Sequence, residues 1–252
     1  MIRLRRLQPY GYQLFMLAYT PVGLYADSRV ANVWQQAFLG LITFGVLVLA
    51  TRLASPMQRR QVWLAVGIAT CGELYFSLVV GLYRYRFDNV PLYVPAGHGL
   101  VYLFALTSAR TPLLLARRRL LVGAALVIAS AWALAGLTAL PLVTGRVDLT
   151  GALLWPLFIY FTLRSRQAPV YAAAFLITSL LEICGTSFGN WAWRPMAPFT
   201  HLTQGNPPSV IAGGYCLLDA TVIRLAPRLP TGSQALAALA AARRRLALAF
   251  GQ

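Results

Sequence analysis

The chain has 252 residues, of which 58% are hydrophobic and 11% are charged, and its mean hydropathy is +0.63. A soluble domain carries about 25% charged residues, so this composition excludes an ordinary soluble protein and predicts an all-α integral membrane protein. The net charge is +16, and all 22 basic residues are arginine. The arginines fall in short segments between apolar runs, which fits membrane orientation signals rather than a nucleic-acid partner.

Eight apolar segments approach the length of about 20 residues that crosses a bilayer. In chain order they cover residues 10–26, 33–51, 61–83, 91–109, 119–141, 149–164, 168–188 and 208–226. The first follows a basic stretch, which also fits a signal peptide, but Gln13, Pro21 and Gly23 favour a retained span. The sequence therefore predicts about eight transmembrane helices.

Arginine-rich connections alternate with connections of lower net positive charge along the whole chain. The rich ones precede the first span, lie between the second and third, fourth and fifth, and sixth and seventh spans, and follow the eighth. This alternation predicts that both termini are cytoplasmic, in what we expect to be a bacterial inner membrane. Residues 231–252 are expected to form a cytoplasmic amphipathic tail on the membrane surface.

The only two glutamates of the chain begin the same pattern twice, in the third and seventh segments. In each copy a glutamate is followed by a glycine, two aromatics at alternate positions and an arginine: Glu73, Gly81, Tyr83, Tyr85 and Arg86, then Glu182, Gly189, Trp191, Trp193 and Arg194. The copies are offset by 108 to 109 residues. We expect two parallel four-helix repeats, residues 1–112 and 113–230, related by a pseudo-two-fold axis along the membrane normal.

The candidate catalytic residues are the two glutamates with His98 and Asp219. An acid inside an apolar span is costly and needs a reason. Helical rise places Glu73 about 12 Å, and Glu182 and His98 about 10 Å, from the outer end of their segments, with Asp219 deeper at about 18 Å. Each could instead be a structural hydrogen-bonding group.

Candidate substrate-binding residues lie near the expected outer membrane surface. They are Tyr83, Tyr85, Arg86, Asn190, Trp191, Trp193, Arg194 and Asn206. The expected arrangement is an aromatic and arginine rim around an outward-facing mouth, where arginines could hold an anionic head group. The alternative is an ordinary interfacial aromatic belt.

Paired buried carboxyl groups suit acid–base chemistry on a membrane-borne lipid or isoprenoid, by hydration, isomerisation or cyclisation. Aromatic faces can stabilise a developing cation. No cofactor is predicted. Two alternatives remain: a proton-coupled transporter or lipid flippase with a central acidic site, and a metal-dependent enzyme in which Glu73, Glu182 and His98 hold the ion.

The stretch from Glu182 to Trp193 reads Glu-x-x-Gly-Thr-x-Phe-Gly-x-Trp-x-Trp, and Val90-Pro91 and Val94-Pro95 follow the first aromatic pair. These two patches resemble the integral-membrane carotenoid-biosynthesis family that includes carotenoid hydratases. The resemblance implies a membrane enzyme that acts on the end group of a long polyene. Small membrane terpene cyclases, which also use intramembrane acids, match less well.

Overall fold

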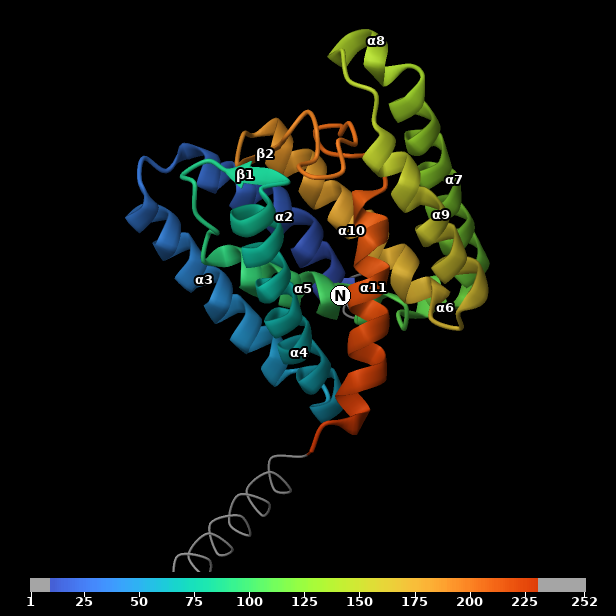
Figure 1. The fold of residues 1–252 in the computed structure, drawn as a ribbon. Helices are drawn as coiled ribbons and strands as arrows, with labels where there is room; N and C mark the ends of the chain where they lie inside the picture. Colours follow the sequence, from blue (N-terminus) through green and yellow to red (C-terminus); the bar gives the residue numbers. More distant parts are fainter. Residues whose placement is uncertain (1–9, 231–252) are drawn as a thin grey trace, which may run out of the picture.

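The computed structural model describes residues 10–230. This part of the chain is mostly helical, and each of the eight predicted apolar segments contains a helix (Figure 1). The α-helices are α2 (Gly11–Arg29), α3 (Val33–Arg52), α4 (Pro56–Glu73), α5 (Tyr93–Ser108), α6 (Pro112–Ala116), α7 (Arg118–Leu137), α8 (Leu140–Thr144), α9 (Leu149–Arg164), α10 (Ala168–Ser187) and α11 (Ile211–Leu225). The predicted tail, 231–252, lies outside the described residues.

Besides the α-helices, the structure contains short elements that the sequence did not predict. A π-helix, η2 (Leu74–Val80), continues α4, and a short 3-10 turn, η3 (Ala226–Arg228), follows α11. Two strands, β1 (Tyr83–Tyr85) and β2 (Trp191–Trp193), pair antiparallel. Each strand is three residues long, too short for its alternation to be recognised as a strand from the sequence.

Four helices of the described residues are long and apolar enough to cross a membrane: α3, α4 continued by η2, α7 and α10. Their outer faces carry large apolar side chains in contact with the surroundings; Phe38 is 63% exposed and Val127 is 69% exposed. Hydrocarbon surroundings accept such side chains, whereas water does not. The helices therefore indicate an integral membrane protein.

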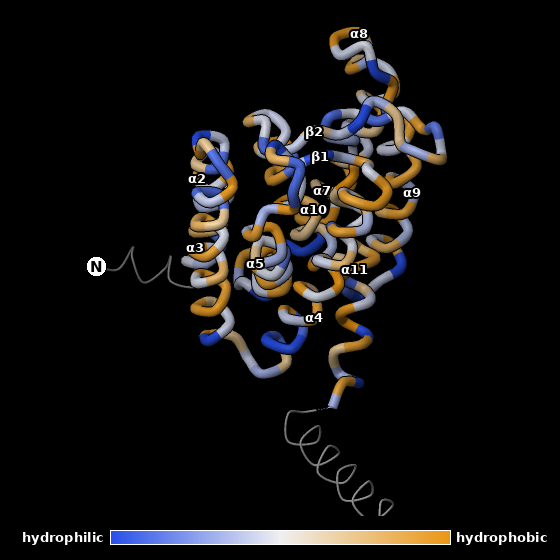
Figure 2. The backbone as a smooth tube through the Cα atoms, turned by 60° about the vertical axis from the view of Figure 1, so that its left-hand side comes forward, coloured by the Kyte–Doolittle hydropathy of each residue, from blue (hydrophilic) through white to orange (hydrophobic). Residues whose placement is uncertain are grey.

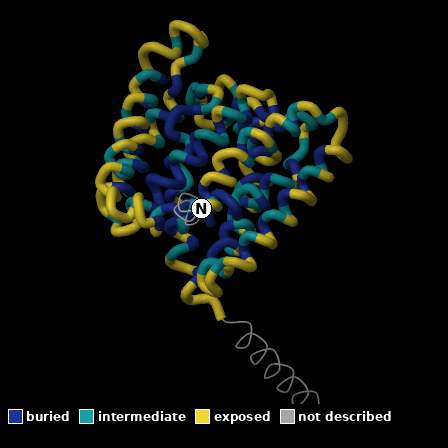
Figure 3. The backbone as a smooth tube through the Cα atoms, turned by 180° about the vertical axis from the view of Figure 1, so that it is seen from behind, coloured by how far each residue is buried: buried dark blue, intermediate teal, exposed yellow. Residues whose placement is uncertain are grey.

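Helices α5 and α10 form the centre of the molecule. They pack on each other, α5 also contacts α3 and α4, and α10 also contacts α7 and α11. Figure 3 shows the buried residues concentrated on these inner helices and the exposed residues on the outer ones. Small residues permit this packing: a Cβ atom at Gly99 would lie 2.7 Å from the Val66 side chain and 2.9 Å from Leu47.

Helix ends are fixed by local capping. Ser55 and Gln58 form a capping box at the start of α4, and the Asn32 side chain accepts from two backbone N–H groups at the start of α3. These side chains satisfy the unpaired N–H groups of a first helical turn. Gly81 (φ 71°) and Gly189 (φ 76°) take the left-handed conformation two residues before each strand begins.

The two ends of the molecule differ. The sheet β1–β2 and α8 lie at one end, whereas the α3–α4 connection, α6 and the end of α11 lie toward the other (Figure 1). Hydrophilic backbone segments, blue in Figure 2, gather near the ends of the long helices, with apolar stretches between them. The small sheet therefore closes one polar end of the helical assembly.

Candidate active site

The Glu73 carboxylate lies beneath strand β1 and accepts two hydrogen bonds from it. The hydroxyls of Tyr83 and Tyr85 donate to Glu73 Oε2 at 2.6 and 2.8 Å. Glu73 is the last residue of α4 and is 8% exposed. Both tyrosines project from the inner face of β1, because alternate residues of a strand face the same side.

The Glu182 carboxylate is held in the same manner beneath strand β2. The indole N–H groups of Trp191 and Trp193 donate to Glu182 Oε2 at 3.0 and 3.2 Å. Glu182 lies in the last third of α10 and is 5% exposed. The ring of Trp191 packs directly on the backbone of Gly185, where a Cβ atom would overlap it at 1.9 Å.

The two strands meet in a register that relates the two copies of the sequence pattern. Tyr83 faces Trp193, Arg84 faces Ala192 and Tyr85 faces Trp191. Just outside the strands, the backbone N–H of Arg86 donates to the Asn190 carbonyl, and the backbone N–H of Arg194 donates to the Leu82 carbonyl. Arg86 and Arg194 are equivalent positions 108 residues apart, and so are Leu82 and Asn190. The two bonds are therefore equivalent, and the pairing is symmetric about its centre.

The sequence predicted an aromatic rim around an outward-facing mouth, and for the four aromatic side chains this prediction is wrong. The four rings are buried, with exposures of 6 to 8%, and pack on one another between the two carboxylates. The centroids of Tyr83 and Trp193 are 4.5 Å apart, and those of Tyr85 and Trp191 are 5.8 Å apart. Strand pairing turns the aromatics inward and leaves Arg84 and Ala192 outside. Burial, followed by the charge of Glu73, raises the pKa of both tyrosine hydroxyls above its usual value, so they remain donors.

A π-helical segment compensates for the one-residue difference between the two copies. Glu73 precedes Tyr83 by ten residues, whereas Glu182 precedes Trp191 by nine. The additional residue lies within η2, whose wider turns accommodate an inserted residue without breaking the helix. Glu73 therefore reaches its two aromatics as Glu182 does.

His98, on α5, connects Glu73 to helix α11. Its Nε2 atom lies 3.4 Å from Glu73 Oε1 and 3.1 Å from the Tyr215 hydroxyl, and its Nδ1 atom lies 2.9 Å from the Val94 carbonyl. Since a carbonyl only accepts, Nδ1 carries hydrogen. Nε2 is then left either to accept from Tyr215 or to share a proton with Glu73.

Tyr215 is a functional candidate that sequence reasoning missed. Its ring stacks on that of His98 with the ring centroids 5.6 Å apart, and its hydroxyl lies 3.1 Å from His98 Nε2. The sequence held a weak signal, because Tyr215 directly follows Gly214, the residue aligned with His98 in the two copies. Tyrosine is common in apolar helices, so its presence alone did not mark it as functional.

Arg86 and Asn190 form hydrogen bonds around Asp27, another buried acid, at the end of α2. The Arg86 guanidinium donates to the carbonyls of Ser28, Asp27 and Val30 at the end of α2. Asn190 donates to the Asp27 carboxylate and to the Leu24 carbonyl. Arg86 and Asn190 are thus engaged in joining elements of the protein.

Arg194 and Asn206 occupy the loop side of the sheet. The Arg194 guanidinium lies against Gly81, where a Cβ atom would approach it at 3.1 Å, at the end of η2. Asn206 accepts a 2.8 Å hydrogen bond from the backbone N–H of Trp193. Of the predicted arginines, Arg194 is the one whose guanidinium has no hydrogen bond within residues 10–230.

The two aromatic pairs that donate to Glu73 and Glu182 are called the clamps below. Asp219 lies apart from both. It is on α11, one helical turn beyond Tyr215, and is 3% exposed. Its Oδ2 atom has no hydrogen-bond partner within the described part of the chain. The structure thus brings Glu73 and His98 into contact, links Glu182 to them through the aromatic rings, and leaves Asp219 in a deeper layer.

The metal arrangement considered from the sequence is not formed. Within residues 10–230, no three His, Cys, Asp or Glu side chains lie close enough together to hold one ion. Glu73 and His98 are neighbours, but Glu182 faces the two tryptophans of its own strand. Each carboxylate is held by the donors of its own strand, so the two do not converge on one point.

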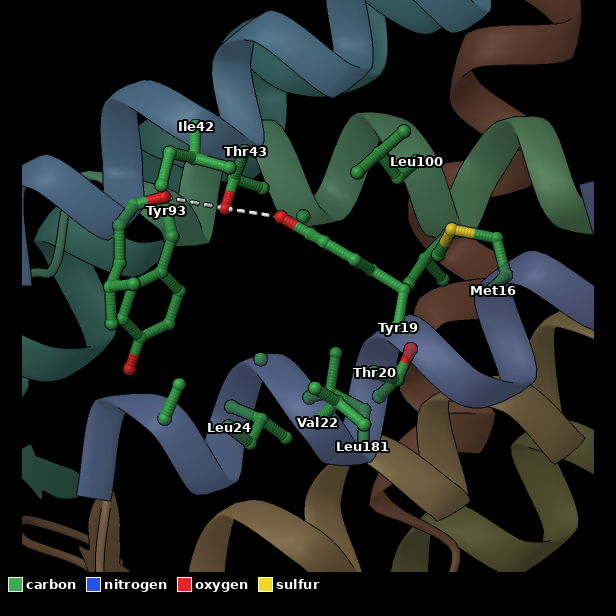
Figure 4. Close-up of a pocket in the computed structure, with 15 residues that line it drawn as sticks. Met16, Tyr19, Thr20, Val22, Leu24, Ile42, Thr43, Tyr93, Leu100 and Leu181 are labelled. Carbon is green, nitrogen blue, oxygen red and sulfur yellow. Dashed lines mark hydrogen bonds between the residues drawn. The ribbon is translucent and has the colours of Figure 1, made fainter. Parts of the chain in front are cut away.

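An apolar cavity of about 240 Å³ lies beside the site, between α2, α3 and α5 (Figure 4). Its walls include Met16, Ile42, Leu100 and Leu181, and the hydrogen bond from Tyr19 to Thr43 crosses it. Tyr93, Leu24 and Leu181 line the cavity and also pack against the aromatic cluster above the glutamates. The cavity therefore adjoins that cluster, and its apolar walls suit a hydrocarbon chain.

Comparison with known proteins gives no relative: no protein-family model, curated protein or solved structure matches the chain.

Proposed function

We propose that the protein is a polytopic membrane enzyme that performs acid–base chemistry on a lipid or isoprenoid. The observation that carries this proposal is the contact between Glu73 and His98 within an otherwise symmetric pair of carboxylate clamps. A buried carboxyl group in contact with an imidazole is suited to general acid–base catalysis. Glu73, His98 and Tyr215 are the groups to which we assign proton transfer.

The different donors of the two clamps support separate roles for the two glutamates. Tyrosine hydroxyls, which hold Glu73, can pass a proton along a hydrogen-bond chain; indole N–H groups, which hold Glu182, donate without titrating. The two indole N–H donors hold the Glu182 carboxylate in one orientation. In this proposal Glu182 is the oriented carboxylate that lies beside the developing cation, and Glu73 delivers the proton.

The proposed architecture is eight membrane spans in two parallel repeats with both termini cytoplasmic. The symmetric strand register, the matched clamps and the two left-handed glycines support the repeats. Packing supports them in part, because α4 with α5 and α3 with α5 correspond to α10 with α11 and α9 with α11. The arginine-rich connections at the end away from the sheet favour the cytoplasm on that side.

The substrate class follows from the walls of the site. An alkene within a hydrocarbon chain fits the apolar cavity, and its protonation would form a cation that aromatic faces and the Glu182 carboxylate stabilise. The resemblance of the Glu182–Trp193 stretch to carotenoid hydratases favours a long polyene, to which water would add. Hydration adds one water molecule to the product and needs no cofactor.

The test is product formation from an acyclic polyene in detergent micelles containing the purified full chain, followed by mass spectrometry. Glu73→Gln should lower the rate by about 10²-fold or more, the usual contribution of a general acid. Glu182→Gln should give a smaller loss, because the proton donor remains. Asp88→Asn, an exposed acid in the loop after β1, is the matched control and should act as wild type. Full activity of both glutamate variants would exclude the mechanism.

A proton-coupled transporter is the second candidate, favoured by the buried polar groups that continue inward from the site at Asp219. Chemistry and transport are separable, since an enzyme changes substrate mass in micelles and a transporter needs a sealed vesicle. Flux in vesicles without any product in micelles would replace the enzyme proposal with this one.

A further inference from the structure

Four buried polar side chains lie on three neighbouring helices, one helical turn inward of the proposed site. They are Tyr102 on α5, Thr178 and Ser179 on α10, and Asp219 on α11, and each is 7% exposed or less. In each of them a side-chain oxygen has no hydrogen-bond partner within residues 10–230: Tyr102 Oη, Thr178 Oγ1, Ser179 Oγ and Asp219 Oδ2. These four residues are called the inner polar layer below.

Helical spacing places the inner polar layer directly below the residues of the site. Tyr102 follows His98 by four residues, Asp219 follows Tyr215 by four, and Thr178 precedes Glu182 by four. Residues four apart share a helix face, at a separation of about 6 Å along the axis. The three helices are in contact, through α5 with α10, α10 with α11, and the bond between His98 and Tyr215.

Tyr215 lies between the inner polar layer and the proposed site. It is one helical turn above Asp219 on α11, and its hydroxyl lies 3.1 Å from His98 Nε2. His98 Nε2 in turn lies 3.4 Å from Glu73 Oε1. Tyr215 is therefore the polar group that connects the inner polar layer to Glu73.

The hydroxyls of the layer are not satisfied in the manner usual for a helix. Thr43, Thr107 and Thr186 each donate to the carbonyl four residues earlier in their own helix. Thr178 and Ser179 make no such bond. Buried polar atoms left unpaired are destabilising, and in native proteins such clusters are satisfied by ordered water that makes about three hydrogen bonds per molecule.

We propose that the inner polar layer binds ordered water, and that this water exchanges protons with the Glu73–His98 pair through the Tyr215 hydroxyl; the second part rests on the proposed function. Tyr215 passes its proton to His98 Nε2 while its oxygen takes one from the bound water, and Asp219 restores the proton to that water. One proton thus moves from Asp219 to the site, and no other bond changes. Asp219 and Tyr215 act as relay residues behind the catalytic pair.

Hydroxyl-radical footprinting of the purified full chain, with X-ray radiolysis and mass spectrometry, tests the bound water without any substrate. Radicals formed from a bound water molecule label the side chains beside it, even when these are buried. Tyr102 should be labelled several-fold faster than Phe175, which is equally buried but stacks on Phe158 in an apolar cluster. Equal, slow labelling of Tyr102 and Phe175 would overturn the proposal in the wild-type protein, whatever any variant does.

Variants separate the water from the relay. Asp219→Leu combined with Ser179→Ala should reduce the labelling of Tyr102, whereas Glu73→Gln should leave it unchanged. Tyr215→Phe should retain the labelling but lower turnover in the polyene assay, and turnover at the wild-type rate would exclude the relay. Slow Tyr102 labelling with inactive Glu73→Gln would reject the water and keep the proposed function. Fast labelling of Tyr102 together with a fully active Glu73→Gln variant would keep the bound water and reject the proposed function.

Discussion

At Asp27, one carboxylate joins three elements. It accepts hydrogen bonds from Gln36 on α3 at 2.9 Å, from Tyr93 on α5 at 2.9 Å, and from Asn190, just before β2, at 2.5 Å. Asp27 is 1% exposed. From the sequence it reads as a loop charge beside Arg29, because burial by distant segments leaves no local signal.

Asp27→Asn should destabilise the protein by about 2 kcal/mol or more, since an amide N–H would face donors that now have a charged acceptor. Thermal unfolding in detergent measures this as a lowered Tm. Asp88→Asn is the control, because Asp88 is exposed and the substitution is the same. Equal Tm values for the two variants would show that the Asp27 network contributes little.

Tyr83 and Tyr85, the two tyrosines that donate to Glu73, should make the protein less stable at high pH. Burial and the Glu73 charge raise their pKa, so the folded protein retains protons that the unfolded chain releases. Their contribution is complete below about pH 10, the usual tyrosine pKa, and is lost as the pH rises further. Tm should therefore fall above that pH, and more steeply for the wild type than for Tyr83→Phe with Tyr85→Phe. If Tm fell equally steeply with pH in the wild type and in the double variant, the loss of stability at high pH would come from other groups.

Among the elements, η2 has a specific task, which is to absorb the additional residue between Glu73 and Gly81. Its counterpart, the end of α10, reaches Gly189 in seven residues without a π-turn. The difference was visible in the sequence as an offset of 108 against 109 residues. Only the structure showed which helix adapts, because the choice depends on the strand register that both copies must satisfy.

Deletion of Val79 from η2 should therefore be tolerated, since α-helical turns can then connect Glu73 to Gly81. Deletion of Ile183 from α10 should be strongly destabilising, because it rotates Glu182 away from the two tryptophans by about 100° relative to the following chain. Val79 and Ile183 are both exposed apolar residues, 71% and 47%, which makes the pair matched. The size-exclusion profile and the Tm of each deletion variant show whether it folds. A folded Ile183 deletion with an unfolded Val79 deletion would refute the role assigned to η2.

At the scale of the whole molecule, the sheet end and the arginine-rich end are expected on opposite sides of the membrane. Single cysteines placed in a background lacking Cys71, Cys184 and Cys216 test this orientation. Thr200→Cys, in the exposed loop after β2, should react with an impermeant thiol reagent in intact cells. Gln167→Cys, between α9 and α10, should react only after permeabilisation. The opposite pattern would invert the proposed topology.

The sequence by itself determined the membrane class, the eight helical segments and the recurrence of the glutamate pattern. Each of these depends on properties of contiguous residues: apolar length, arginine placement and a fixed order of residue types. Glu73, Glu182 and His98 could be chosen because charged or titratable groups are rare in apolar segments.

Only the tertiary structure decided what those groups contact. Pairing of β1 with β2 turned the aromatics inward onto the carboxylates and did not form the expected rim. Packing of the helices brought Tyr215 on α11 to His98 on α5, across 117 residues of chain. Tertiary contacts also joined Arg86 to α2 and Asn190 to Asp27, so that these side chains do not border an open mouth. The physical reason is that such contacts depend on strand register and helix packing between distant segments, which no local pattern of residues encodes.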